Sequence, residues 1–194
     1  MKGLSTVLLS EATPGCPRET ELVRACQQKR LGAEERLYKH FYGYVMSISL
    51  RYASGRDEAQ EITDDSFMKA FAGIDKFDTQ QSIKPWLRRI VINTAVDYHR
   101  KNKRYQQALT IECVSIPVEE HSISQLTLEE MLEIIRQLPD LLRITFNLYE
   151  IEGYSHQEIA QRLGISESSS RVYLTRAKQR LRALYQRYWG EYNG

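Results

Sequence analysis

Cysteine is scarce in this chain, and its three cysteines form no pattern typical of a zinc site or a disulfide framework. They are odd in number and widely spaced, at Cys16, Cys26 and Cys113. The four histidines are also scattered, without the spacing of metal ligands. We therefore expect no metal, no cofactor and a reducing, cytoplasmic compartment.

Long hydrophobic runs are missing as well. No apolar stretch approaches the roughly eighteen residues that a membrane-spanning helix needs. The apolar stretch at residues 3–10 is too short for a secretory signal, and no clear cleavage site follows it. We expect neither membrane insertion nor export, although the 42% hydrophobic content is enough for one compact domain or two small ones.

Proline and glycine are sparse within long segments whose apolar residues recur at helical spacing. No segment alternates between apolar and polar residues as a half-buried strand does. The sequence therefore predicts an all-α fold. The predicted helices are residues 19–30, 33–52, 56–74 and 84–104, followed by residues 126–137, 139–152, 155–163 and 166–188.

The order of these helices predicts two small helical domains joined by a flexible linker. The first domain covers residues 18–104, and the second covers residues 126–190. Residues 105–125 contain Pro117, scattered serines and acids, and little periodicity, which is typical of a linker.

The formal net charge of +2 conceals a segregation of charge along the chain. Residues 57–65 contain five acids and no base, whereas residues 86–104 contain six Lys or Arg residues against one acid. Residues 105–135 contain six acids and no base, and residues 168–190 contain six Lys or Arg residues and no acid. Two basic surfaces of this kind indicate a polyanionic partner such as nucleic acid.

Residues 155–166 have the pattern of a helix-turn-helix motif. Ser155 and Glu158 have the spacing of a capping box, in which each side chain satisfies a free backbone amide at the helix start. Gly164 provides the positive φ at which that helix ends, and Ser166 is a good N-cap for the next helix. The small Ala160 lets the two helices approach closely, so that the second helix can enter a DNA major groove.

The second helix of this motif has one apolar and one basic side. Its apolar residues recur at steps of three and four, which predicts that they face the core: Leu174, Ala177, Leu181, Leu184 and Tyr188. Its basic residues point mostly outward: Arg171, Arg176, Lys178, Arg180 and Arg182. A basic helix is most often only a solvated surface, but the capping box, the turn and the absence of nearby acids favour DNA binding.

The helix predicted at residues 84–104, which follows a polar loop at residues 78–83, is divided in the same way. Its apolar side consists of Trp86, Leu87, Ile90, Val91, Thr94 and Tyr98. We expect Trp86 to be a core aromatic residue rather than a base-stacking one, because its neighbours at helical spacing are apolar. The other faces and the C-terminal end, where a polyanion can dock, collect Arg88, Arg89, Arg100, Lys101, Lys103 and Arg104.

The helix predicted at residues 56–74 has an apolar and an acidic arc. The apolar arc consists of Ala59, Ile62, Phe67, Ala70 and Ile74. The acidic arc consists of Asp57, Glu58, Glu61, Asp64 and Asp65. Clustered carboxylates repel one another, so a cationic protein partner is one explanation for the arc and a merely solvated face is the other.

The chain resembles the extracytoplasmic-function sigma factors of the sigma-70 family, which keep only the second and fourth conserved regions of larger sigma factors. In the first domain, the run from Asp57 to Phe67 resembles the family's core-binding helix, and the agreement resumes from Trp86 to Asn93 and at Asp97 and Arg100. In the second domain, the similar residues are Leu138-Pro139, Arg143, Phe146 and Leu148, followed by Gly153-Tyr154-Ser155 and Glu158-Ile159-Ala160. The chain departs from the family at Ser168-Ser169-Ser170, where many members have Gly-Thr-Val, and at Asp64, where glutamine is usual.

This resemblance implies an RNA polymerase sigma factor, which binds core polymerase and directs it to promoter DNA. A coiled coil of the β′ subunit would bind Asp57, Glu58, Glu61, Asp64 and Asp65. The loop at residues 78–83 would capture a flipped base of the −10 element. The −10 element would contact Asp78, Thr79, Gln80, Gln81, Ser82, Arg88, Arg89, Asn93, Arg100 and Lys101. The −35 duplex would contact Ser168, Ser169, Arg171, Val172, Thr175, Arg176 and Lys178. The resemblance leaves open whether an anti-sigma protein is a further partner.

Two other functions are compatible with parts of the sequence. An autonomous helix-turn-helix regulator would use its first domain as a sensor, but that domain has its own basic helix and no nucleotide or metal motif. A nucleic-acid enzyme would use acids such as Asp57, Asp64 and Asp65 to hold Mg²⁺, but no lysine, histidine or phosphate-binding loop accompanies them. We therefore expect no enzymatic activity.

Overall fold

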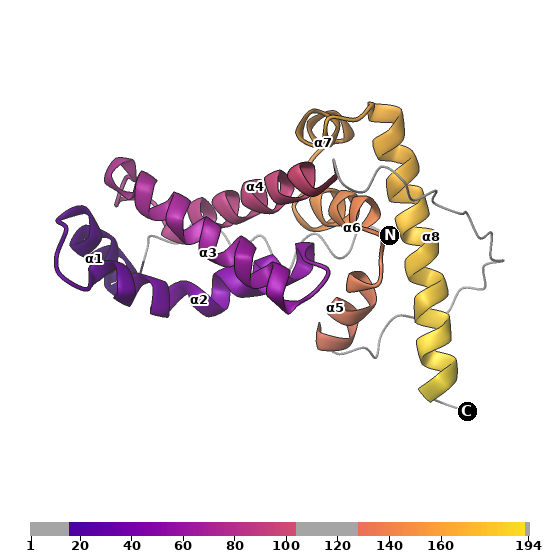
Figure 1. Ribbon diagram of the computed structural model, residues 1–194, viewed down its shortest axis with the longest axis horizontal. Coiled ribbons are helices and arrows are strands. Elements are labelled where there is room, and N and C mark those ends of the chain that lie inside the picture. The colour runs from indigo at the N-terminus through magenta and orange to yellow at the C-terminus, as the bar shows by residue number, and fades with distance from the viewer. Residues whose placement is uncertain (1–15, 104–127, 193–194) are drawn as a thin grey trace. The chain divides into compact units, whose positions relative to one another are not determined.

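The computed structural model describes residues 16–103 and 128–192 of the chain. Every regular element in these two ranges is helical, and neither range contains a strand (Figure 1). The chain divides into two compact units, the first ending at Tyr98 and the second beginning at His99. The all-α prediction is confirmed. The predicted linker lies outside the described residues, and the predicted domain bounds stay a prediction.

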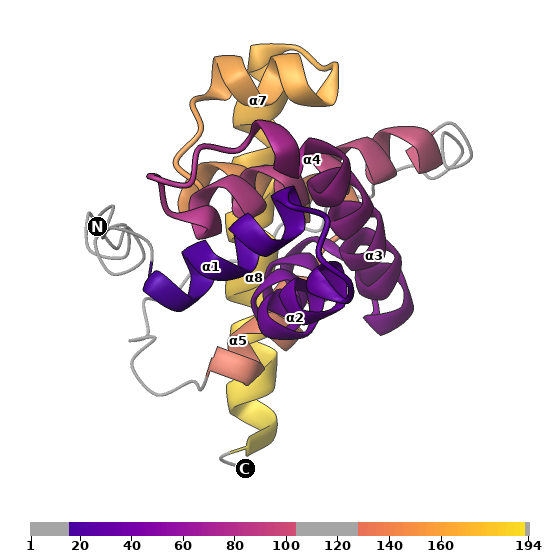
Figure 2. The ribbon, with the colours of Figure 1, turned by 90° about the vertical axis from the view of Figure 1, so that its left-hand side faces the viewer.

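The first unit is built on a pair of long helices. Its elements are α1 (Pro17–Gln27), α2 (Ala33–Tyr52), α3 (Arg56–Gly73), the 3₁₀ turn η1 (Ile74–Lys76) and α4 (Ile83–Lys103). The boundary between the units falls within α4, after Tyr98. The pair is α2 and α3, which pack against each other, while α1 packs against α2 and η1 returns the chain to α1. Figure 2 shows α2 nearly end-on, with α1 and α3 on either side of it.

The first helix ends earlier than predicted, at Gln27 rather than at residue 30. Lys29 has φ +52° and Gly32 has φ +68°, both in the left-handed region that an α-helix cannot contain. The amide of Arg30 instead donates to the carbonyl of Ala25 at 3.0 Å, which closes the turn. The chain therefore reverses direction immediately after Gln27.

The buried residues of the first unit match the predicted apolar side on α3 but extend beyond it on α4. Every member of the predicted apolar arc is buried: Ala59, Ile62, Phe67, Ala70 and Ile74. On α4, Ile92, Ala95 and Val96 are buried in addition to the predicted side. Trp86 is half-buried with its ring centroid 5.0 Å from that of Phe77, as expected for a core aromatic residue.

The second unit packs short helices against a long one. Its elements are α5 (Leu128–Arg136), α6 (Asp140–Phe146), the π-helical turn η2 (Asn147–Ile151), α7 (His156–Leu163) and α8 (Glu167–Tyr192). The long helix is α8, against which α5, α6 and α7 all pack (Figure 1). Its core cluster consists of Leu138, Leu142 and Ala177, with Phe146, Tyr173, Leu181 and Leu184 packed against them.

The single helix predicted at residues 139–152 is interrupted in the structure. From Asn147 the chain adopts a π-helical turn, in which the amide of Glu152 donates to the carbonyl of Asn147 at 3.0 Å. The turn ends before Gly153, whose φ of +76° lies in the left-handed region. A continuous α-helix was therefore the wrong prediction for this segment.

A buried arginine joins α5 to α6. The Arg143 side chain is 1% exposed, and its Nη1 donates to the carbonyls of Arg136 at 3.0 Å and Leu138 at 2.8 Å. Its Nη2 pairs with the carboxylate of Asp140 at 2.7 Å. The guanidinium thus satisfies two carbonyls at the end of α5, where the helix leaves its last acceptors without partners.

Candidate functional site

The helix-turn-helix begins with the capping box that the sequence predicted. The Ser155 Oγ accepts a hydrogen bond from the Glu158 amide at 3.3 Å, and the Glu158 Oε2 accepts one from the Ser155 amide at 2.8 Å. Hydrogen bonds from the Ser155 backbone and hydroxyl hold the pKa of the Glu158 carboxyl below its ordinary value. Gly164 ends α7 with φ +64°, as predicted.

The second helix of the motif, α8, is capped by a serine hydroxyl. The Ser166 Oγ accepts a hydrogen bond from the Ser169 amide at 3.0 Å, which makes Ser166 the N-cap. The same oxygen lies 2.8 Å from the Ser168 Oγ and 2.7 Å from the Ser169 Oγ. Ser168 and Ser169, which lie in the segment where many family members have Gly-Thr-Val, thus form a hydrogen-bonded group with Ser166 at the start of the helix.

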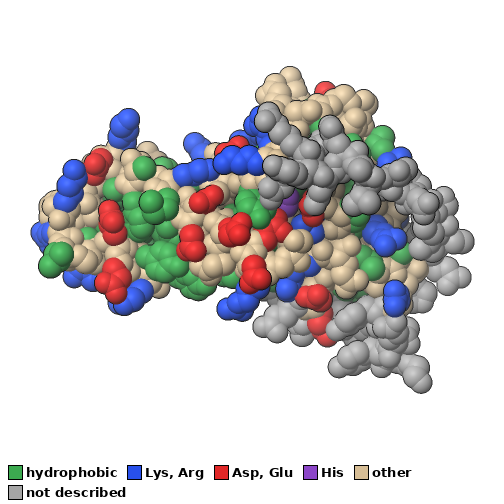
Figure 3. All heavy atoms as spheres, viewed as in Figure 1, with side chains coloured by type: hydrophobic (Ala, Val, Ile, Leu, Met, Phe, Trp, Pro, Cys, Tyr) green, Lys and Arg blue, Asp and Glu red, His purple; other side chains and the backbone are tan. Residues whose placement is uncertain are grey.

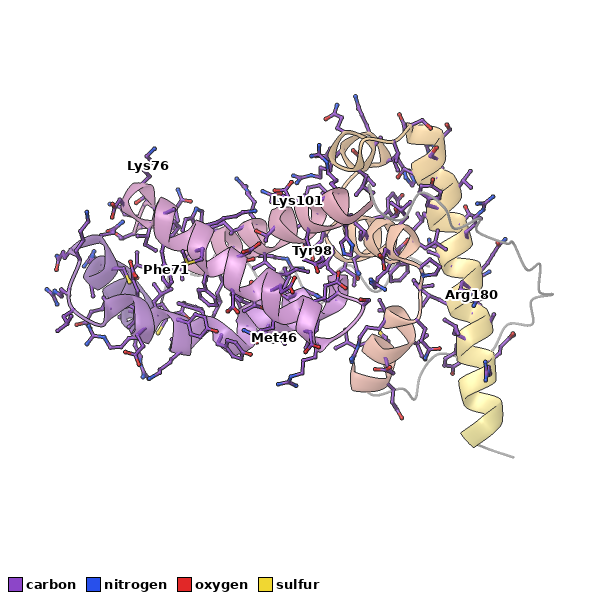
Figure 4. All side chains as sticks on the ribbon, viewed as in Figure 1. Met46, Phe71, Lys76, Tyr98, Lys101 and Arg180 are labelled. Atoms are coloured by element: carbon purple, nitrogen blue, oxygen red, sulfur yellow. The ribbon has the colours of Figure 1, made fainter. Side chains whose placement is uncertain are left out.

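One side of α8 is buried in its own unit, and the other is open to solvent. Leu174 and Ala177 are buried, as predicted, and Leu181 and Leu184 pack against the core cluster. Of the residues expected to contact the −35 element, Arg171, Val172 and Thr175 are exposed, as is Ser168, whereas Ser169, Arg176 and Lys178 are half-buried. Figure 4 labels Arg180, an exposed cation in the middle of this helix.

Two of the predicted DNA-contacting cations have carboxylate partners within the chain. Arg171 pairs with Glu167 one turn earlier on the exposed surface, with 2.5 Å between Nη2 and Oε1. Lys178 pairs with Glu150 of η2, with 2.6 Å between Nζ and Oε1. The charge counts that led to the basic-surface prediction did not anticipate these pairs, because Glu167 lies directly before the basic run and Glu150 lies much earlier in the chain.

A histidine joins the two helices of the motif. The Nδ1 of His156 on α7 lies 3.0 Å from the Ser170 Oγ on α8. The ring of Tyr149, from η2, stacks on the His156 ring with 4.5 Å between centroids. Burial and, next, the positive charge of Arg171 hold the pKa of His156 below 6.5. Sequence reasoning missed this contact, since it treated the histidines only as potential metal ligands.

The acidic arc lies on the solvent side of α3, where Figure 3 shows acidic side chains beside exposed hydrophobic surface. Asp57, Glu61, Asp64 and Asp65 are exposed. Glu58 is half-buried, and its Oε2 accepts a hydrogen bond from the Ser54 amide at 2.9 Å. Glu58 therefore stabilises the start of α3, which sets it apart from the four exposed acids.

Asp64, which replaces the family's usual glutamine, is tied to α2. Its Oδ1 accepts a hydrogen bond from the Tyr38 hydroxyl at 3.1 Å and lies 3.0 Å from the Gln60 Nε2. Burial and the hydrogen bond to Asp64 raise the pKa of the Tyr38 phenol. Asp64 thus has a packing role as well as a place on the acidic arc.

The predicted −10 loop is ordered by its first residue. The Asp78 Oδ1 accepts a hydrogen bond from the Gln80 amide at 2.9 Å, and the Asp78 carbonyl accepts one from the Gln81 amide at 3.0 Å. This arrangement is an Asx turn, which fixes the backbone of the loop locally. Asp78, Gln80 and Gln81 are exposed, while Thr79 and Ser82 are half-buried.

The polar residues predicted on α4 reach solvent. Arg89, Asn93, Arg100 and Lys101 are exposed and Arg88 is half-buried. Figure 4 labels Lys101, near the C-terminal end of the helix. Helical spacing places Arg89, Asn93 and Arg100 on one face, so this side of α4 combines an amide with cations.

Within residues 16–103 and 128–192, no three His, Cys, Asp or Glu side chains are grouped as a metal site would require. Across the same residues, no helix has the length and apolar character needed to cross a membrane.

The match to known protein families follows the division into two units. Residues 37–105 match the family model of Sigma-70 region 2, and residues 128–181 match that of Sigma-70, region 4. The ECF RNA polymerase sigma factor SigM of Bacillus subtilis is 28% identical over 160 residues, which are 79% of this chain and 95% of that protein. The ECF RNA polymerase sigma-E factor of Haemophilus influenzae is 27% identical, over 81% of this chain and 90% of that protein.

The chain belongs to the extracytoplasmic-function sigma factors of the sigma-70 family. The resemblance drawn from the sequence is therefore confirmed, and the sigma factor interpretation holds over the autonomous regulator. Among solved structures, the NMR structure of an engineered region 2 of sigmaE in complex with GTAAAA is 27% identical, with a TM-score of 0.44. The match covers 46% of this sigma factor and 93% of the chain in that structure.

Proposed function

We propose that this sigma factor divides promoter recognition between its two units, with the first unit also binding core polymerase. The observation that carries this proposal is the segregation of charge on the folded helices. Exposed acids gather on α3, exposed cations and an exposed amide lie on α4, and the outer side of α8 carries cations. Surfaces of opposite sign favour different partners, because each attracts the complementary charge.

The acidic arc of α3 is the proposed contact for the β′ coiled coil. Glu61 and Asp65 are exposed one helical turn apart, Asp57 extends the surface one turn toward the start of α3, and Asp64 lies next to Asp65. DNA phosphates would be repelled by this face, so a cationic protein surface is the complementary partner. The exposed Met68, one turn beyond Asp64, adds apolar contact area at the edge of the arc.

The loop at residues 78–82 and the polar face of α4 are the proposed contact for the melted −10 element. The Asx turn leaves the amide side chains of Gln80 and Gln81 exposed, where they can hydrogen-bond to the edge of an unpaired base. Arg89, Arg100 and Lys101 supply the cations that a single-stranded backbone requires.

The exposed side of α8 is the proposed reader of the −35 duplex. Arg171 and Thr175 lie one turn apart on this side, and Val172 offers an apolar contact for a thymine methyl group. The cap at Ser166 places the positive helix terminus at the same end, where it favours a phosphate. This is the arrangement by which a helix-turn-helix positions its second helix in the major groove.

The decisive experiment compares two pairs of substitutions in holoenzyme assembled with core polymerase. Arg171→Ala with Arg176→Ala should weaken binding to −35 duplex by about 1 to 3 kcal/mol for each base-contacting arginine, and a premelted template should not restore it. Gln80→Ala with Gln81→Ala should spare −35 binding and weaken capture of a melted −10 strand. Arg24→Ala, an exposed cation on α1, is the control for loss of charge. The opposite pattern of defects would reverse the assignment of the two promoter elements.

The polymerase, in this proposal, supplies all the catalysis, and the sigma factor contributes binding, orientation and DNA melting. This division of labour also implies that the sigma factor acts in the cytoplasm with its polymerase. An anti-sigma protein is a further proposed partner, which would silence the factor by covering the acidic arc. An anti-sigma protein that bound without competing with core polymerase would contradict this mode of silencing.

A further inference from the structure

The first helix holds the N-terminal end of the proposed −10 loop through one side chain. The Nε2 of Gln27 donates hydrogen bonds to the carbonyls of Ile74 at 2.9 Å and Phe77 at 2.8 Å. Both carbonyls lie just before Asp78, about fifty residues later in the chain. One amide thus uses both of its donors on the backbone segment that enters the loop.

The same helix holds the other end of the loop through a buried carboxylate. The Glu19 side chain is 8% exposed, and its Oε1 lies 2.9 Å from the Nζ of Lys84 at the start of α4. The His40 Nε2 lies 3.6 Å from the same oxygen. A carboxylate withdrawn from water is costly unless it is paired, so this pairing favours a fixed position of Lys84 relative to α1. The Tyr44 hydroxyl, which donates to the Lys84 carbonyl at 3.2 Å, restrains the same residue.

The loop packs against α1 between these two anchors. Thr20 and Val23 of α1 line a shallow hollow together with Phe77, Thr79 and Gln81 of the segment that follows η1. Thr79 is half-buried there, whereas Gln80 next to it is exposed. The loop therefore has an inner side that rests on α1 and an outer side on which Gln80 is exposed.

The loop's own hydrogen bonds cannot fix that orientation. The bonds made by Asp78 reach only to Gln80 and Gln81, so they set the local turn but not its direction relative to α2 and α3. The long-range restraints come from Gln27 and Glu19, which lie two turns apart on one helix. Restraint of this kind reduces the conformational entropy that the loop must lose when it binds DNA.

We propose that Gln27 and Glu19 are positioning residues that hold the −10 loop in its DNA-binding conformation. The inference rests on the proposed function of that loop. Neither side chain needs to touch DNA, because each acts through the backbone or side chain at one end of the loop. Loss of either restraint should therefore weaken capture of the melted −10 strand while leaving core binding and −35 binding intact.

The test uses the full chain in holoenzyme with Gln27→Ala and, separately, Glu19→Gln with Lys84→Met. The control is Gln28→Ala, an exposed neighbour at the end of α1. Three quantities are measured for each: affinity for core polymerase, affinity for a −35 duplex, and affinity for a single-stranded −10 oligonucleotide against a scrambled one. Hydrogen exchange of the amides at residues 78–84 reports directly on the loop, and circular dichroism reports on the fold.

The expected result for Gln27→Ala is a loss of roughly threefold to tenfold in −10 affinity, the size of one or two hydrogen bonds, with faster exchange at residues 78–84. Weaker −10 affinity and faster exchange at residues 78–84 are also expected for the Glu19→Gln and Lys84→Met double variant. That variant tests the inference if Gln27→Ala does not fold. Unchanged loop exchange and unchanged −10 affinity in a folded variant would overturn the inference. If the Gln80→Ala and Gln81→Ala holoenzyme also bound −10 DNA normally, the proposed function of the loop would fail instead.

Discussion

Arg171 and Glu167 form an ion pair across one turn of α8, on the surface proposed to face the −35 duplex. The carboxylate competes with DNA for the guanidinium, and it also lies where phosphates would approach. We predict that Glu167→Gln increases −35 affinity about twofold to fivefold, because an exposed pair contributes well under 1 kcal/mol and a nearby repulsive charge is removed as well. Fluorescence anisotropy with holoenzyme measures the effect. Glu133→Gln, on α5, is the control, and lower affinity of the Glu167 variant would show that the pair orients Arg171 usefully.

Charge reversal on the acidic arc should abolish tight binding to core polymerase. Glu61→Lys with Asp65→Lys changes two exposed acids that lie one turn apart on the arc and leaves Glu58 and Asp64, which accept hydrogen bonds, in place. We predict more than about tenfold weaker core affinity, since a cationic partner would then be repelled.

The matched control for this prediction carries the same change of charge elsewhere. Glu21→Lys with Glu133→Lys alters exposed acids on α1 and α5. Net charge alone predicts equal losses for both double variants, whereas a specific surface predicts a loss only for the α3 variant. If a variant with Glu61, Asp64 and Asp65 all changed to Lys bound core polymerase with wild-type affinity, the acidic arc of α3 would not be the core-binding surface.

Replacement of the buried Arg143 should destabilise the second unit. Arg143→Met keeps much of the volume but leaves the carbonyls of Arg136 and Leu138 and the carboxylate of Asp140 without the guanidinium. We predict a loss of about 2 to 4 kcal/mol in the free energy of unfolding. Denaturant unfolding followed by circular dichroism measures it, with Arg182→Met on the exposed side of α8 as the control. Equal stability of the two variants would show that α5 and α6 do not depend on this arginine.

The stability of the helix-turn-helix should fall in mild acid because of His156. Its pKa in the folded protein is held below 6.5 by burial and by Arg171, with Lys178 acting in the same direction and Glu167 opposing them. As pH falls below 6.5, the unfolded state therefore takes up the proton first, and stability is lost until the folded pKa is reached.

A His156→Gln variant tests this dependence, since glutamine can still hydrogen-bond to Ser170. We predict that the variant loses less stability than the wild-type chain between about pH 7.5 and about pH 5.5. Thermal unfolding at each pH measures the difference between the two proteins, which cancels contributions from the other histidines. An identical pH dependence would show that His156 protonates equally in both states.

Local rules predicted the elements of this protein better than its long-range contacts. The capping box at Ser155, the glycine exit at Gly164 and the cap at Ser166 all depend on residues within one turn, and all three are confirmed. The burial of Glu19 and the reach of Gln27 to the loop depend on residues far along the chain, and no periodicity in the sequence reports them.

The candidate site shows the same limit. Helical periodicity placed four of the five acids of the arc, and Arg171 on α8, correctly in solvent, because amphipathic spacing depends only on the helix. It did not distinguish the acid at Glu58, which accepts a hydrogen bond from the Ser54 amide just before α3, from the acid at Glu61. Nor did it show that Lys178 is paired with Glu150, since this contact depends on the π-helical turn.

That turn makes the length of the segment as important as its composition. A π-helical turn contains an extra residue compared with an α-helix, so deletion of one residue between Asn147 and Ile151 would restore regular α-helical bonding. Each residue of an α-helix advances by about 100°, and the side chains beyond the deletion would rotate by that amount. Glu150 and Tyr149 would then leave Lys178 and His156, respectively. The contacts of Glu150 and Tyr149 therefore depend on the number of residues in this segment as well as on their side chains.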